Sequence, residues 1–102
     1  MKVALAALRV PAVARLYGGR LGEIATYYPG GRIEGVRVDD DRVEMHIVVR
    51  LDLATPLEAA EEVRRAVGPL VAPKRVDVIV EDVEWLGEAD TTSVAQPVNP
   101  PS

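Results

Sequence analysis

The sequence of 102 residues has no cysteine, no phenylalanine and a single histidine, His46. Without cysteine, disulfides and thiolate metal sites are excluded. One histidine is too few for a zinc site of the usual kind, which needs several nitrogen, sulfur or carboxylate ligands. The only serines, Ser93 and Ser102, lie in a polar stretch at the C-terminal end. Since catalysis needs a nucleophile, an acid or base, or a metal within mutual reach, these absences predict a non-enzymatic protein without metal or cofactor.

Positive charge is also scarce. The chain has 12 basic and 16 acidic residues, a formal net charge of −4, so no overall basic field draws in nucleic acid. The charge is uneven: residues 1–38 hold six basic and two acidic groups, and the remainder holds six basic and fourteen acidic groups. Such charge usually solvates a surface, and it can also orient a partner.

Long apolar runs are missing too. After Met1-Lys2, residues 3–8 are apolar, but Arg9 follows and there is no cleavage-site pattern, so the start does not read as a signal peptide. No stretch approaches the roughly 20 apolar residues of a spanning helix. We therefore expect a cytoplasmic protein with no direct membrane insertion.

The apolar residues that are present are mainly valine, alanine, leucine and isoleucine, which suit a sheet with helices packed on it. Residues 3–16 are alanine-rich with leucines at helical spacing, and Pro11 predicts that this helix ends or kinks near Val10. Residues 17–32 contain five glycines and one proline. They predict a long loop, the kind of segment in which binding residues often lie.

From Ile33 the apolar period changes to two, which predicts a β-hairpin turning at Asp39-Asp40-Asp41. The second strand has a buried face made of Val43, Met45, Ile47, Val49 and Leu51. Its opposite face, which we expect to be largely wet, is made of Arg42, Glu44, His46, Val48 and Arg50.

Thr55-Pro56-Leu57-Glu58 predicts a capped helix start. A buried helix face follows at helical spacing: Leu57, Ala60, Val63 and Val67. Gly68-Pro69 predicts the helix end, and residues 76–83 predict a last strand that crosses over to lie parallel to its predecessor. The prediction is therefore an α+β domain over residues 1–86, of order α-β-β-α-β. It has two layers: a three- or four-stranded sheet with two helices on one face. Residues 87–102 predict a disordered tail.

Several of these segments together resemble the conserved segments of a known protein family. They are Val10-Pro11-Ala12-Val13, Gly35-Val36-Arg37-Val38, the long strand at residues 43–50, the helix with Pro56, Leu57, Ala60, Val63 and Val67, and the strand at residues 76–83. Together, over residues 4–84, they resemble the alkaline shock protein family of bacterial cell-envelope stress proteins, in particular its short actinobacterial members. Ala12 stands where that family usually has glycine.

The resemblance implies a non-catalytic adaptor that helps to maintain the cell envelope under stress. It implies a protein partner, since some relatives are held at the inner face of the membrane by a small membrane-anchored protein. A peripheral location at that face would follow. The family offers no catalytic residues to transfer to this chain.

Polar residues that could carry chemistry each have a simpler interpretation. Glu44 and His46 could share a proton in a small enzyme, but a solvated strand histidine is the commoner case. Asp39-Asp40-Asp41 lacks the spacing of a calcium loop and reads as a solubilising turn. Gly19-Arg20-Leu21-Gly22 matches the four-residue clamp of KH-type RNA-binding proteins, so a KH-like module for single-stranded RNA is the alternative function. That clamp joins two helices, whereas here a loop follows it.

Two surfaces remain as candidates for protein contact. Arg20, Tyr27, Tyr28 and Arg32 are residue types that carry binding energy at interfaces, and the tyrosines could equally fold over the core. Ile33, Val48, Ile79 and Val83 interrupt the charged sheet face and could form an apolar patch for self-association into a homo-oligomer. An exposed edge strand is a second route to self-association.

Overall fold

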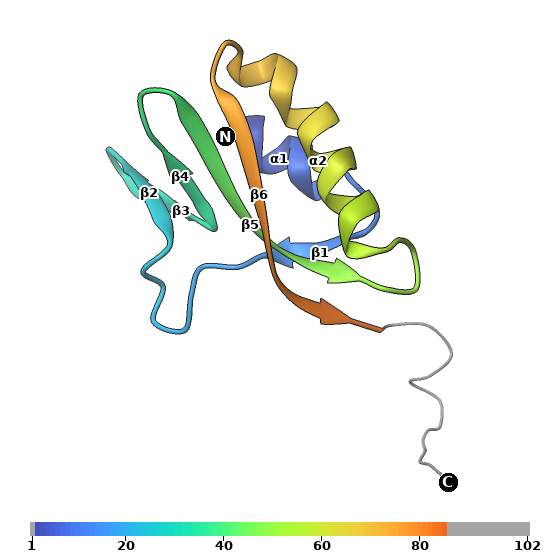
Figure 1. Ribbon diagram of the computed structural model, residues 1–102. Helices are drawn as coiled ribbons and strands as arrows, with labels where there is room; N and C mark the ends of the chain where they lie inside the picture. The colour runs from blue at the N-terminus through green and yellow to red at the C-terminus, as the bar shows by residue number, and fades with distance from the viewer. Residues whose placement is uncertain (1, 86–102) are drawn as a thin grey trace, which may run out of the picture.

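The computed structural model describes residues 2–85, and the predicted tail at residues 87–102 lies outside them. The described part contains two helices and six strands: α1 (Lys2–Leu8), β1 (Val13–Leu16), β2 (Ala25–Tyr28), β3 (Gly31–Glu34), β4 (Val36–Val38), β5 (Arg42–Arg50), α2 (Pro56–Val71) and β6 (Arg75–Glu84). Figure 1 shows both helices on the same side of β5 and β6, so the predicted α+β class is confirmed. None of these helices has the length and apolar character needed to cross a membrane.

Strand β5 organises the main sheet. β6 pairs with it in parallel along its whole length, as the crossover through α2 requires. β1 and β4 both pair with it antiparallel, β4 over Val43–Met45 and β1 over Ile47–Val49. His46 lies between these two stretches: its carbonyl accepts from the Tyr17 amide and its amide donates to the Gly35 carbonyl, both at 2.8 Å. β1 and β4 therefore share one edge of β5 in continuous order.

Residues 18–34 leave this shared edge and return to it. The sequence predicts a loop here, but the structure has an antiparallel hairpin of β2 and β3, which projects away from the helices (Figure 1). Its turn is Pro29-Gly30, with a φ of 93° at Gly30. A proline followed by a residue of positive φ matches a type II turn, which the many glycines around it concealed.

The predicted helix over residues 3–16 is half correct. α1 ends at Leu8, close to the end expected from Pro11, but residues 13–16 form β1 instead of continuing the helix. Val13 pairs with Val49 and is buried. Four residues are too few for a clear period, so pairing with β5 decided their conformation.

Helix α2 starts as predicted. The Thr55 hydroxyl accepts from the Glu58 amide at 3.1 Å, and the Glu58 carboxylate accepts from the Thr55 amide at 2.9 Å. Two details of the predicted helix were wrong. The helix runs through Pro69 to Val71 instead of ending at Gly68, and Leu57 is exposed, its expected place in the core being taken by Ala59.

The core lies between the helices and the sheet. The strand valines, Met45 and Ile47 of the predicted inner face are buried there, together with Ala59, Val63 and Val67 of α2. Leu51 was predicted to join them, but it lies beyond the end of β5 and is partly exposed. The opposite face of β5, predicted to be wet, is also covered over its second half, because His46 and Val48 are buried.

Candidate interaction surface

The segment predicted as a binding loop, residues 17–32, contains the two most exposed large hydrophobic side chains of the described residues. Tyr27 is 69% exposed, and Leu21, in the segment before β2, is 91% exposed. Tyr27 lies directly opposite Arg32 in the hairpin. Side chains of opposite residues in an antiparallel pair project from the same face and touch, so Tyr27 and Arg32 form one unit.

Arg32 fixes this unit to the rest of the hairpin. Its guanidinium donates to the Tyr27 hydroxyl at 3.5 Å, to the Gly22 carbonyl at 3.2 Å and to the Glu34 carboxylate at 2.5 Å. The Tyr27 hydroxyl and then the Glu34 carboxylate raise the pKa of Arg32, so the side chain is a permanent cation. The bond to Gly22 also fixes the chain next to Leu21. We call Leu21, Tyr27 and Arg32 the hairpin surface.

Tyr28, the neighbour of Tyr27, does not belong to this surface. Successive side chains in a strand point to opposite faces, and Tyr28 lies over Gly31, where an added Cβ would be 2.9 Å from its hydroxyl oxygen. Thr26 and Ile33 share this second face. The Thr26 hydroxyl donates to the Val36 carbonyl, and Ile33 packs against the core, so this face turns toward the body of the protein.

Arg20 is likewise separate from Tyr27 and Arg32. It is exposed in the turn Gly19–Gly22 and makes no hydrogen bond or ion pair to any described residue. This turn links β1 to β2, whereas a KH clamp links two helices. The Glu23 carboxylate accepts from the Leu21 amide at 3.0 Å and lies against Gly19. An acidic side chain therefore holds the position that a phosphate would need.

The backbone explains the electrostatics of Glu23. Amide groups of Glu23 itself and of Leu21, with a smaller contribution from Arg37, lower the pKa of the Glu23 carboxyl. Its charged form is thus stabilised by the folded turn.

The four residues of the predicted apolar patch do not gather on one surface. Ile33 faces inward from the hairpin, and Val48 has 0% exposure. The pairing of β6 with β5 skips Glu81, which forms a bulge, so Val83 pairs with Val49 on the core side of the sheet. Only Ile79, opposite His46, remains partly accessible on the far face. A contact surface built from these four residues is therefore not available.

His46 lies in a buried polar network, not in solvent as expected. It is only 8% exposed. Its Nε2 atom is 2.8 Å from Glu44 Oε1, and its Nδ1 atom is 2.5 Å from Glu81 Oε2. The ring therefore lies between two carboxyl groups, and its contact with Glu81 joins β5 to β6.

The network continues along the far face of the sheet. Arg42 reaches Glu44 and Asp77, each at 3.4 Å, and Arg75 reaches Asp77 at 3.3 Å. At the other end, Arg15 of β1 pairs with Glu84 of β6. That pair spans β5, since β1 and β6 lie on its two sides.

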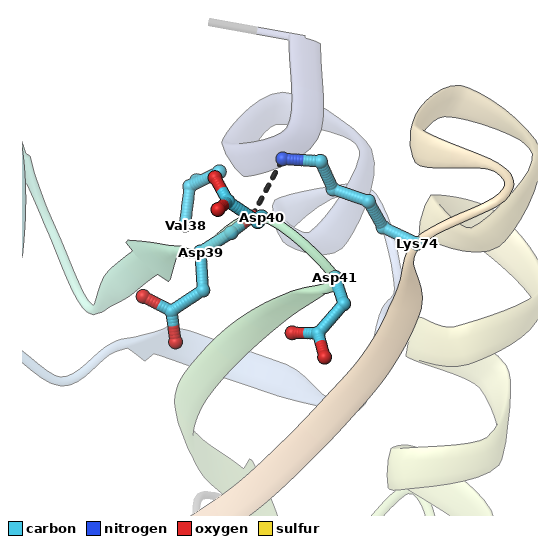
Figure 2. A pocket seen from close by; sticks show the side chains of 5 residues that line it. All are labelled: Val38, Asp39, Asp40, Asp41 and Lys74. Carbon is cyan, nitrogen blue, oxygen red and sulfur yellow. Dashed lines mark hydrogen bonds between the residues drawn. The ribbon is translucent and has the colours of Figure 1, made fainter.

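The turn Asp39-Asp40-Asp41 forms one wall of a shallow hollow of about 630 Å³, with Lys74 on the other side. Figure 2 shows the Asp40 carboxylate on the opposite side of the turn from those of Asp39 and Asp41. The Lys74 ammonium donates to the Asp39 carbonyl at 2.6 Å. Within residues 2–85 there is no group of three or more histidine, aspartate or glutamate side chains placed to hold a metal ion.

Sequence reasoning found Tyr27 and Arg32 but missed two features. Leu21 was overlooked because a single exposed leucine carries no pattern. The contact of His46 with Glu81 was missed because it joins residues 35 positions apart. The Tyr28-Pro29-Gly30 turn, between two short β-prone runs, was the signal that could have revealed the hairpin.

No family model, no curated protein and no solved structure matches this chain.

Proposed function

We propose that this chain is a non-enzymatic protein-interaction domain that binds a protein partner through the hairpin surface of Leu21, Tyr27 and Arg32. The observation that carries the proposal is the exposed Tyr27 ring held by Arg32 on a projecting hairpin. Tyrosine and arginine concentrate binding energy at interfaces because each combines apolar area with a polar group.

Tyr27 and Arg32 are already held in place before a partner binds, and this favours binding. Ordering a mobile side chain at an interface costs about 0.5–1.5 kcal/mol. Arg32 already has three partners in the free protein, and the hairpin ladder fixes the backbone on both sides of the pair. Less conformational entropy is then lost when a partner docks.

The non-enzymatic part of the proposal is supported by the state of the single histidine. Both ring nitrogens of His46 already have carboxylate partners, and the ring is buried. A general base must reach a proton on a substrate, and His46 is not free to do so.

The biological setting within this proposal comes from the resemblance of residues 4–84 to envelope stress proteins. On that basis the domain is an adaptor in cell-envelope homeostasis, and its partner is a small membrane-anchored protein that holds it at the inner face of the membrane.

The test is Tyr27→Ala, compared with Tyr28→Ala as the matched control on the other face of the hairpin. With the wild-type chain as bait, partners are recovered from cells, identified by mass spectrometry and then titrated as purified proteins. We expect Tyr27→Ala to weaken binding at least about tenfold, as loss of an interface anchor does. Its free energy of unfolding should change by less than about 0.5 kcal/mol, because the ring is mostly in solvent.

Two outcomes contradict the proposal. One is a partner that binds Tyr27→Ala as tightly as the wild-type chain. The other is a large loss of stability in Tyr27→Ala, which would make the ring structural. Tyr27→Phe refines the result: it keeps the ring and removes the hydroxyl that contacts Arg32, so its affinity should lie between those of the wild type and Tyr27→Ala.

A further inference from the structure

Strand β6 has an open edge. Among the described residues it pairs only with β5. In a strand, every second residue turns its backbone N–H and C=O groups toward the opposite edge, so on β6 these groups point away from β5 without strand partners. Natural edges are usually protected by charge, proline or a bulge. Val78, Ile79 and Val80 have none of these, and each is partly exposed.

The opposite edge of the sheet differs, because the hairpin excursion covers part of it. The Thr26 hydroxyl donates to the Val36 carbonyl, and the Ile24 carbonyl accepts from the Gly35 amide. β1, which completes that edge, has only four residues. The unprotected part of β6 is thus the better place for another strand to add.

The charges of β6 identify the strand that fits. In an antiparallel pair of two β6 strands related by a two-fold axis at Val78, residues opposite each other share a face. The pairs are Arg75 with Glu81 and Asp82, Val76 with Val80, Asp77 with Ile79, and Val78 with its own copy. Glu81 and Asp82 are taken together because the bulge leaves both on the far face, where Arg75 lies.

Other registers fit less well. If the register shifts by one residue, the valine side chains of one copy lie on the same face as the charged side chains of the other. A shift by two residues in one direction brings Asp77 against the partner's Asp77, and in the other direction it brings Asp77 against Glu81. Like charges directly opposite each other destabilise a strand pair. Only the axis at Val78 sets each Arg75 against acidic residues and aligns the valines.

We propose that a second copy of this chain pairs with the open edge of β6, antiparallel and with the two-fold axis at Val78. The two sheets become one continuous sheet. The Val76, Val78 and Val80 side chains of both copies form a ladder on the helix side, and Arg75 meets Glu81 and Asp82 of the second copy on the far side. This interface is separate from the hairpin surface and does not depend on the function proposed for it.

The experiment measures mass in solution by sedimentation equilibrium over a wide range of concentrations. The wild-type chain should pass from 11.0 kDa to twice that mass as its concentration rises. Arg75→Glu places like charges at both symmetric contacts and should raise the dimer dissociation constant on the order of tenfold or more. Asp82→Lys should weaken the dimer less, because Glu81 still faces Arg75.

Mixing the two variants tests the register. In a dimer with one Arg75→Glu chain and one Asp82→Lys chain, one contact keeps its full attraction and the other is close to neutral. The mixture should therefore dimerise more tightly than either variant alone. Arg9→Glu makes the same charge change at an exposed position after α1, away from β6, and should dimerise as the wild type does.

The proposal is overturned if the wild-type chain stays monomeric throughout, if Arg75→Glu dimerises as well as Arg9→Glu, or if mixing recovers nothing. Should a variant lose its circular dichroism spectrum, amide exchange of the wild-type chain decides instead. Alternate amides between Val76 and Val80 should become protected as concentration rises. Protection that rises elsewhere and not in β6 would place the contact on another surface.

Discussion

At the scale of single residues, the buried ring of His46 has a carboxyl group at each of its two nitrogens. Glu44 and Glu81 hold the two sides of the ring, and their side chains are themselves 16% and 28% exposed. The ring hydrogen-bonds β5 to β6 at the middle of the sheet.

Replacing His46 with alanine should therefore destabilise the fold. The partly buried Glu81 carboxyl would lose its partner and Glu44 would keep only Arg42, which costs on the order of 1–3 kcal/mol. The free energy of unfolding from urea titrations measures the change. A solvated strand histidine would give a change below about 0.5 kcal/mol, and such a small value would contradict the network. His46→Leu combined with Glu81→Leu should recover part of the loss, since an apolar pair leaves fewer charges unmatched.

Glu23 gives a prediction for acid pH. Backbone amides of Glu23 and Leu21 lower the pKa of its carboxyl from an ordinary value of 4.5. A carboxyl with a lowered pKa stabilises the folded state above its unfolded pKa, and that contribution is lost as the pH falls through the folded pKa. In an NMR titration, the Glu23 carboxyl carbon should have a midpoint below 4.5, and the Leu21 amide should follow the same curve.

The matched variant is Glu23→Gln. At neutral pH it should lower the melting temperature slightly. At a pH below the Glu23 midpoint it should leave the melting temperature unchanged, because the wild-type side chain is then also uncharged. A midpoint at or above 4.5 would show that the Gly19–Gly22 turn does not stabilise the charged carboxylate of Glu23.

At the scale of elements, α2 depends on its first turn. Thr55 and Glu58 satisfy one another's backbone amides, and Pro56 needs no hydrogen-bond acceptor. The helix covers β6 with Ala59, Val63 and Val67, so loosening its start also loosens the core.

Thr55→Ala should lower the free energy of unfolding by about 1 kcal/mol, the usual effect of losing a capping side chain. Thermal or urea unfolding followed by circular dichroism measures it. Thr55→Ser is the control, because serine also caps a helix and should retain most of the stability. Equal losses in the two variants would show that the Thr55 methyl group, and not the cap, is what matters.

The two faces of the β2–β3 hairpin have different roles. It carries the hairpin surface on one face, and through Thr26 and Ile33 it covers the β4 edge with the other. An isolated two-stranded hairpin is marginal in water. Its contacts with β4 and the core therefore stabilise the surface that we propose to bind a partner.

At the scale of the whole molecule, the two edges of the sheet differ. One edge is partly covered by the hairpin, and the other, β6, is open among the described residues. If two copies join at β6, the dimer carries two hairpin surfaces. A partner with two binding sites, or partners clustered at a membrane, would then be held more tightly than by one chain.

The sequence by itself determined the elements whose signals are local. The period of two in residues 43–50, the cap at Thr55 and the stop at Pro11 each act within a few residues, so β5, the start of α2 and the end of α1 could be predicted. Tyr27 and Arg32 could be selected by residue type alone. The missing cysteine and the single histidine limited the possible chemistry in the same way.

Only the tertiary structure decided the rest. Residues 13–16 became a strand because the edge of β5 was available, and His46 became buried because β6 brought Glu81 beside it. The bulge at Glu81 turned Val83 to the core side and dispersed the predicted patch. These outcomes depend on contacts between residues far apart in the chain, and no local pattern of side chains encodes which strand will lie next to which.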